Sequence, residues 1–126
     1  MIPSLTPKAL ARTCCDLALD KKAEDVVIID LRKLSAPTDY FVICSATTDR
    51  QVKAVVDNVL EGIEKEGHRA WHVEGYTARK WVLIDYVDVV VHVFNDETRR
   101  FYSLESLWGD APIEEVKPTK RRSQRR

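Results

Sequence analysis

Residues 81–94 constrain the fold of this 126-residue chain more than any other stretch. The segment contains two apolar runs, residues 82–84 and 89–91, which a short acidic turn separates. Because both runs are apolar at successive positions, they predict strands of a sheet that is covered on both faces. A core strand requires none of the aromatic and polar residues that the segment also holds. These residues, which are our first candidates for function, are Trp81, Asp85, Asp88 and His92.

Three other segments have the features of helices. Thr6 followed by Pro7 predicts a helix start, with a hydroxyl N-cap and proline at the first helical position. Thr48 and Gln51 predict a capping box, in which each side chain bonds the backbone N–H of the other residue, and Gly67 suits the end of that helix. Residues 96–107 predict a terminal helix. The middle helix has a complete apolar stripe, which we interpret as core: Val52, Val55, Val56, Val59, Leu60 and Ile63.

Residues 26–31 and 40–44 predict two further apolar strands, and residues 69–73 predict a short one. The resulting order, α-β-β-α-β-β-β-α, predicts a single-domain α/β fold with a mixed five-stranded sheet flanked by helices. Ala111 and Pro112 are expected to end the regular structure. The prediction is therefore a domain over residues 1–112 and a basic, disordered tail over residues 113–126.

The formal net charge of zero conceals an asymmetry along the chain. Fourteen of the 20 basic residues and all 20 acidic ones precede residue 117, so the body carries −6 and the last ten residues carry +6. An acidic body favours a basic partner, and a basic tail favours a polyanion. No apolar run has the length of a membrane span and no signal peptide is recognisable, which predicts a cytoplasmic protein.

Most enzymatic chemistry lacks its sequence pattern. The four glycines fit neither a phosphate-binding loop nor a dinucleotide fingerprint. Cys14, Cys15 and Cys44 have no C-x-x-C spacing, so we expect buried free thiols. Asp85 and Asp88 could hold Mg²⁺, which leaves a divalent-metal nucleotidyltransferase as the alternative function. Otherwise we expect no enzyme, no cofactor and no metal.

A set of segments occurs in order and without large gaps over residues 5–112. These segments are KAEDVVIID (22–30), TDYFVIC (38–44), DRQV (49–52), EG (74–75), WVLIDY (81–86), DVVVHVF (88–94) and RFYSLESLW (100–108). Together they resemble the ribosomal silencing factor family, also called RsfS or Iojap-like. Each segment alone is weak, whereas the ordered set is highly specific.

The resemblance implies an α/β fold similar to that of nucleotidyltransferases, without catalytic equipment. It implies a factor that binds the large ribosomal subunit through ribosomal protein L-fourteen. Such a factor sterically blocks joining of the small subunit and thereby represses translation. The resemblance also implies a homodimer when the protein is off the ribosome. Silencing and assistance in large-subunit biogenesis both remain open.

The same resemblance implies a docking edge in the opening segment. Trp81 is the candidate anchor, because buried tryptophan dominates many interfaces. Asp85 and Asp88 would pair with Lys or Arg of the basic ribosomal protein, and Tyr86 and Val87 would add contact area at the turn. The alternative from the residues alone is that Trp81 covers the sheet edge and the aspartates cap a turn.

Three residues of the preceding loop, Glu74, Gly75 and Tyr76, are expected to border the same surface. Many family members have glycine where this chain has Val87. Valine strongly disfavours positive φ, so either the turn uses ordinary φ values or Val87 adds apolar surface at its tip.

Further basic residues are candidates for contact with ribosomal RNA. Arg99, Arg100 and Tyr102 would contact RNA or a dimer mate, or only decorate a helix. The basic residues of the tail that would contact RNA phosphates are Lys120, Arg121, Arg122, Arg125 and Arg126.

Overall fold

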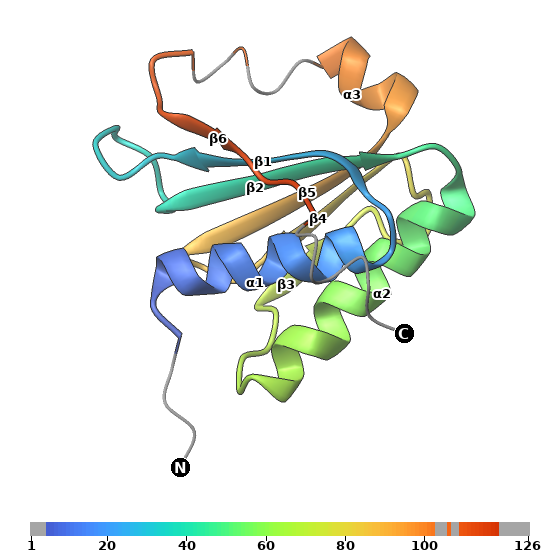
Figure 1. Cartoon of the computed structure of the whole chain (residues 1–126), viewed down its shortest axis with the longest axis horizontal. Helices are drawn as coiled ribbons and strands as arrows, with labels where there is room; N and C mark the ends of the chain where they lie inside the picture. The colour runs from blue at the N-terminus through green and yellow to red at the C-terminus, as the bar shows by residue number, and fades with distance from the viewer. Residues whose placement is uncertain (1–4, 103–105, 107–108, 119–126) are drawn as a thin grey trace.

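The computed structural model describes residues 5–102, 106 and 109–118 (Figure 1). Along the chain its elements are α1 (Pro7–Asp20), β1 (Glu24–Asp30), β2 (Tyr40–Ala46), α2 (Asp49–Lys65), β3 (His72–Glu74), β4 (Trp81–Asp85), β5 (Val89–Asn95), α3 (Asp96–Tyr102) and β6 (Ile113–Glu115). The single-domain α/β fold is thus confirmed.

The sheet has six strands in the order β3-β4-β5-β2-β1-β6. Strands β2 and β5 run parallel and the other neighbours antiparallel, so the prediction of a mixed sheet is confirmed. The prediction of five strands is wrong, and regular structure does not end at Ala111 and Pro112. Strand β6 pairs with β1 through Ile113, whose partner is Ile29. A three-residue edge strand with two acidic residues and a preceding proline has little strand pattern in its sequence.

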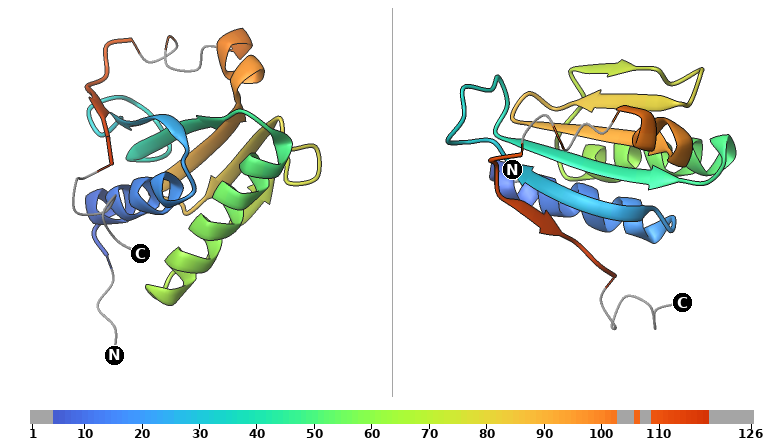
Figure 2. Two further views of the ribbon diagram at one scale, coloured as in Figure 1. Left: turned by 45° about the vertical axis from the view of Figure 1, so that its right-hand side comes forward. Right: turned by 90° about the horizontal axis from the view of Figure 1, so that it is seen from above.

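Helices α1 and α2 cover one face of the sheet, and α3 lies on the other side (Figures 1 and 2). The Thr6 side chain accepts the Ala9 N–H at 3.1 Å, which confirms the predicted start of α1. The apolar stripe of α2 is buried against the sheet, except that Leu60 is half-buried. Each buried Val or Ile side chain contributes roughly 1.5–3 kcal/mol, so this face holds most of the hydrophobic stabilisation.

The start of α2 differs in one detail from the predicted capping box. Gln51 N–H donates to the Thr48 hydroxyl at 3.1 Å, as expected. The Gln51 side-chain oxygen, however, accepts the backbone N–H of Thr47 and not that of Thr48. Its amide nitrogen donates to the carbonyls of Lys21 and Lys22. Gln51 therefore joins the start of α2 to the end of α1, which a local motif does not predict.

Two other predicted elements have shifted bounds. The short strand predicted at 69–73 is β3, His72–Glu74. The terminal helix predicted at 96–107 is α3, Asp96–Tyr102; residues 103–105 and 107–108 lie outside the described part of the chain. The basic tail residues 120–126 lie outside it too, so their contact with RNA stays a prediction.

One candidate for RNA contact has a structural role. Strand β1 shifts register between Glu24 and Val27, and Asp25 has φ +51° at this bulge. Arg99 of α3 donates to the Asp25 carbonyl at 2.7 Å and to the Ser45 hydroxyl at 3.2 Å. The guanidinium of Arg99 therefore ties α3 to the bulge.

Candidate partner-binding site

Alternation along β4 and β5 divides the opening segment between the two faces of the sheet. Val82 and Ile84 point into the helix-side core together with Val89, Val91 and Val93. The intervening residues therefore point to the opposite side, which we call the second face. Its cross-strand rows are Trp81–Phe94–Ser45, Glu74–Leu83–His92–Ile43 and His72–Asp85–Val90–Phe41.

Trp81 and His92 form a pair on this second face. The Trp81 indole Nε1–H donates to His92 Nδ1 at 3.0 Å, and the indole stacks on Phe94 with ring centroids 4.9 Å apart. His92 is only 3% exposed, and Phe41 meets its ring edge-on. Burial lowers the pKa of His92 to about 4, so the ring is neutral near pH 7. Because Nδ1 accepts a hydrogen bond, the neutral ring carries its proton on Nε2.

The turn between β4 and β5 presents its acidic residues in different ways. The Asp85 carboxylate accepts the Val87 N–H at 2.7 Å, so this aspartate does cap the turn. Asp88 holds the turn through its backbone, because its carbonyl accepts the N–H groups of Asp39 and Tyr40. The Asp88 residue is exposed, so its carboxylate is available to a partner.

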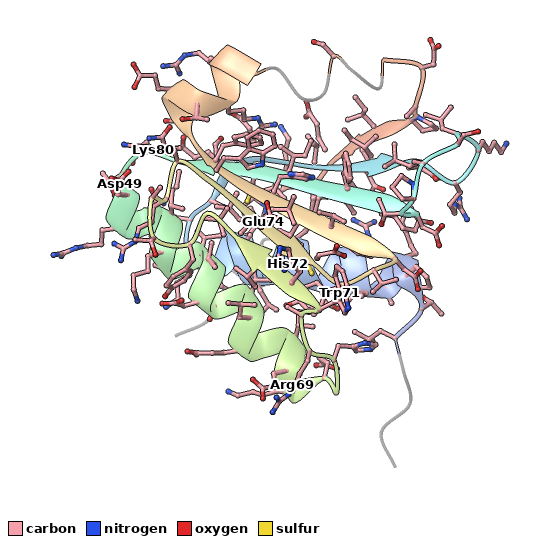
Figure 3. The ribbon with its side chains drawn as sticks, turned by 180° about the vertical axis from the view of Figure 1, so that it is seen from behind. Asp49, Arg69, Trp71, His72, Glu74 and Lys80 are labelled. Atoms are coloured by element: carbon pink, nitrogen blue, oxygen red, sulfur yellow. The ribbon has the colours of Figure 1, made fainter. Side chains whose placement is uncertain are left out.

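An apolar groove of about 450 Å³ lies on the second face beside this turn. Leu83, Val90 and Phe41 supply much of its apolar lining, and Trp71 stands at its edge with 73% of its surface exposed. Figure 3 shows His72 and Glu74 on β3, with Trp71 just before the strand. The full set of lining residues is Pro37, Thr38, Phe41, Trp71, Leu83, Asp85, Val87, Val90 and His92.

Comparison with known proteins gives a consistent result. The family described as "Ribosomal silencing factor during starvation" (RsfS) matches residues 4–126. The ribosomal silencing factor RsfS of Bacillus subtilis is 40% identical over 107 residues, which cover 85% of this chain and 88% of that protein. The chain belongs to the ribosomal silencing factor family.

One further relative and two solved structures extend the comparison. A mouse protein named "Mitochondrial assembly of ribosomal large subunit protein 1" is 33% identical over 95 residues, or 73% of this chain and 42% of the mouse protein. A crystal structure from Chromobacterium violaceum has a TM-score of 0.81 at 29% identity and covers 91% of this chain and 92% of its own. A structure from Bacillus halodurans has a TM-score of 0.76 at 37% identity, covering 86% and 99%. The likeness to nucleotidyltransferases stays a prediction.

The structure places the expected site residues on opposite sides of the sheet, some on the second face and others in the helix-side core. Trp81, Asp85 and Glu74 share the second face, and Val87 and Asp88 lie at its end. Glu74 is exposed, with its carboxylate 2.7 Å from His72 Nε2. Asp85 and Val87 line the groove, whereas Trp81 and Glu74 lie elsewhere on the second face, and their contact with a partner stays a prediction.

Two tyrosines of the expected edge lie on the opposite side. Tyr86 is 8% exposed and packs in the helix-side core, where burial raises the pKa of its hydroxyl. The expectation that Tyr86 adds contact area at the turn is therefore wrong. Tyr76 packs against the same core, and its hydroxyl donates to Asp57 of α2 at 2.7 Å. Tyr76 thus fastens the loop to α2.

The structure also bears on the Mg²⁺ site considered for Asp85 and Asp88 and on the three cysteines. Among the described residues, no group of three or more His, Cys, Asp or Glu side chains is placed to hold a metal ion. Cys14, Cys15 and Cys44 are free and buried, as expected, and burial raises the pKa of the Cys44 thiol to about 12. No helix within the described ranges is long and apolar enough to cross a membrane.

Val87 adopts the conformation that its side chain disfavours. Its φ is +75°, and the Asp88 N–H donates across it to the Tyr86 carbonyl at 2.9 Å, as in a γ-turn. The expectation of ordinary φ values is wrong, whereas the alternative of apolar surface at the tip is confirmed, because Val87 is 58% exposed. Positive φ at a residue other than glycine costs roughly 1–2 kcal/mol.

Replacing Val87 with glycine should therefore stabilise the fold. The free energy gained by relieving the strained φ exceeds the free energy lost through the extra conformational entropy of glycine in the unfolded chain. We therefore expect a net gain of about 0.5–1 kcal/mol in the free energy of unfolding. Urea denaturation would measure it. Val87→Ala is the matched control, because alanine keeps Cβ and hence the strain. A Gly variant no more stable than the Ala variant would contradict the strained turn.

Proposed function

We propose that this chain binds the large ribosomal subunit through the second face and sterically blocks joining of the small subunit. The docking partner is ribosomal protein L-fourteen, and the result is repression of translation. The apolar groove at the acidic turn is the observation that carries the proposal, because binding sites are typically concave and mostly apolar, with a few polar groups in the lining. Membership of the ribosomal silencing factor family supports the ribosome as the target.

Electrostatics favour a basic protein partner at this site. Asp85 lines the groove, and exposed Asp88 and Glu74 lie nearby on the same turn and face. Carboxylates at an interface rim steer a cationic partner and exclude an anionic one. The rim would therefore receive Lys or Arg of the ribosomal protein beside an apolar contact in the groove.

Asp88→Lys tests the proposed docking surface without disturbing the turn. The structural role of Asp88 belongs to its backbone carbonyl, so the exposed carboxylate can be replaced while the fold is kept. Placing a cation opposite a basic partner is expected to weaken binding to purified large subunits about tenfold, which corresponds to roughly 1.4 kcal/mol. Co-sedimentation at two salt concentrations would measure the change.

Glu61→Lys is the matched control, because Glu61 is exposed on α2, which covers the other face of the sheet. It makes the same charge change and should bind like the wild type. Equal binding by Asp88→Lys and Glu61→Lys would remove the turn from the interface. Failure of the wild type to sediment with large subunits would refute the proposed function itself.

A role in large-subunit assembly is the second candidate. The name of the mouse relative refers to mitochondrial assembly of the ribosomal large subunit, and the similarity of this chain to that protein supports the candidate. Both functions require the same docking step. A subunit-joining assay with mature subunits separates them, because a silencing factor inhibits joining whereas an assembly factor need not.

Off the ribosome, we propose a homodimer, as the family resemblance implies. A second copy that covered the groove would remove exposed Trp71 and Val87 from water. Binding to the ribosome would then compete with dimerisation, so affinity for the subunit would fall as the protein concentration rises.

A further inference from the structure

The groove contains two buried polar atoms that have no hydrogen-bond partner. Over the described residues, four buried side-chain atoms lack one: Thr38 Oγ1, Arg79 Nε, Tyr86 Oη and His92 Nε2. Thr38 and His92 both line the groove. A buried polar group without a partner costs about 1–3 kcal/mol, so two such atoms in one apolar groove need an explanation.

The chemical character of the His92 atom is fixed by its neighbour. An indole N–H can only donate, so Trp81 requires His92 Nδ1 to be the acceptor. The neutral ring therefore carries its proton on Nε2, which becomes an unpaired donor. The two ring nitrogens face different directions, so Nε2 is directed away from the indole. His92, which lines the groove, therefore carries a buried donor that has no acceptor.

Thr38 supplies the second polar position. It lies in the segment between β1 and β2, is 5% exposed, and carries a hydroxyl that can donate or accept. Around these two polar atoms the lining is mostly apolar, with Phe41, Leu83 and Val90 among its members. Both atoms are already buried from water, so a purely apolar occupant would leave them unpaired, whereas an occupant with polar groups could supply the missing hydrogen bonds.

We propose that the groove recognises a segment of a basic protein by pairing these two atoms. A large apolar side chain of the partner fills the groove, and an adjacent carbonyl oxygen accepts the His92 Nε2 proton. A polar group of the same segment pairs with the Thr38 hydroxyl. His92 and Thr38 are thus specificity-determining residues. The inference rests on the proposed function, since it names the chemistry by which that docking surface selects its partner.

The size and charge of the groove favour a protein segment over RNA. Its volume of about 450 Å³ lies within the roughly 300–1,000 Å³ typical of ligand-sized clefts, room enough for a large side chain and its backbone. Asp85 is the charged residue of the lining, and the lining includes no Lys or Arg. RNA phosphates require cations at a binding surface, whereas the Asp85 carboxylate in this lining repels phosphates.

Thr38→Val is the decisive variant, because it replaces only the hydroxyl with a methyl group of similar size. In the free protein this hydroxyl is unpaired, so its removal should leave the melting temperature unchanged or raise it. In the complex the partner loses a hydrogen bond, so the Kd for purified large subunits should rise about fivefold to tenfold. Affinity then falls with no loss of stability, which a merely structural role would not produce.

His92→Phe tests the donor and is expected to raise the Kd at least tenfold. This variant also removes the hydrogen-bond acceptor of Trp81, so its stability is measured alongside. If His92→Phe fails to fold, Thr38→Val still tests the proposal. The matched control is Thr13→Val, because the Thr13 hydroxyl bonds the Ala9 carbonyl within α1 and should not affect binding.

The outcomes separate the two proposals. If the wild type binds large subunits and Thr38→Val binds equally well, polar recognition in the groove is refuted while the proposed function stands. If the wild type does not bind, the proposed function fails and this inference fails with it. If Thr38→Val instead loses affinity for protein-free ribosomal RNA, the occupant is RNA and the inference is overturned.

Discussion

Gly75→Ala is expected to destabilise the fold by about 3 kcal/mol or more. Gly75 has φ +79° directly after β3, and a Cβ atom there would overlap the backbone carbonyl oxygen of Trp81. The positive φ costs roughly 1–2 kcal/mol for alanine, and forced overlap in a packed site costs typically 1–3 kcal/mol. Because the atoms in the way belong to the β4 backbone, no side chain can turn aside to relieve the clash.

Urea denaturation of Gly75→Ala beside Gly109→Ala would measure this effect. Among the described residues, an added Cβ at Gly109 meets only the Ser106 carbonyl oxygen, at an ordinary 3.7 Å, so this control should stay close to the wild type. Equal stability of the two variants would contradict the close approach of the loop to β4. Gly75 thus lets the loop after β3 approach β4 closely, and its place at the docking border stays a prediction.

The central strands and both long helices could be predicted from the sequence because their patterns are local. The α2 stripe repeats with helical spacing, and the runs at 82–84 and 89–91 are continuous. Strand β6 could not be predicted in this way. Its three residues hold one apolar side chain, and they form a strand only because β1 offers an edge to pair with. Such pairing depends on contacts between residues distant in sequence.

Part of the candidate surface could also be predicted from a local sequence pattern. Period-two alternation from Trp81 places Asp85 on the face of Trp81, and it places Tyr86 with Val82 and Ile84 in the core. That parity was available in the sequence and would have excluded Tyr86. Phe41 could not be found in this way, because its place in the groove depends on the parallel register of β2 against β5.

The pairing of Trp81 with His92 explains two of the four unusual residues of the opening segment. Trp81 stands opposite Phe94 in the register, one row from His92, and diagonal cross-strand neighbours are within reach of aromatic side chains. Trp81→Ala would therefore remove the stack and leave His92 Nδ1 unpaired, with a cost of roughly 3–5 kcal/mol. Loss of binding by that variant would not separate docking from folding, which is why Asp88→Lys and Thr38→Val are better probes.

Acidification is expected to destabilise the protein through His92. Burial lowers the pKa of His92 from 6.5 to about 4 in the folded chain. Between these values the unfolded chain binds a proton that the folded chain does not, so the free energy of unfolding rises with pH. This contribution is fully present above pH 6.5 and is lost as pH falls to 4. At about 1.4 kcal/mol for each pKa unit, the loss is about 3 kcal/mol.

Urea denaturation at several pH values between 4 and 7 would measure this dependence. His92→Phe should flatten the slope, whatever its absolute stability, because phenylalanine cannot bind a proton. Thr13→Val is the control, because it removes no titratable group and should keep the slope. Asp30 has its pKa lowered from 3.8 to about 2 by its hydrogen bonds with Arg32, so its own stabilisation is lost only below this window. A His92→Phe chain with the wild-type slope would mean that another group carries the acid sensitivity, because only a pKa that differs between the folded and unfolded states produces it.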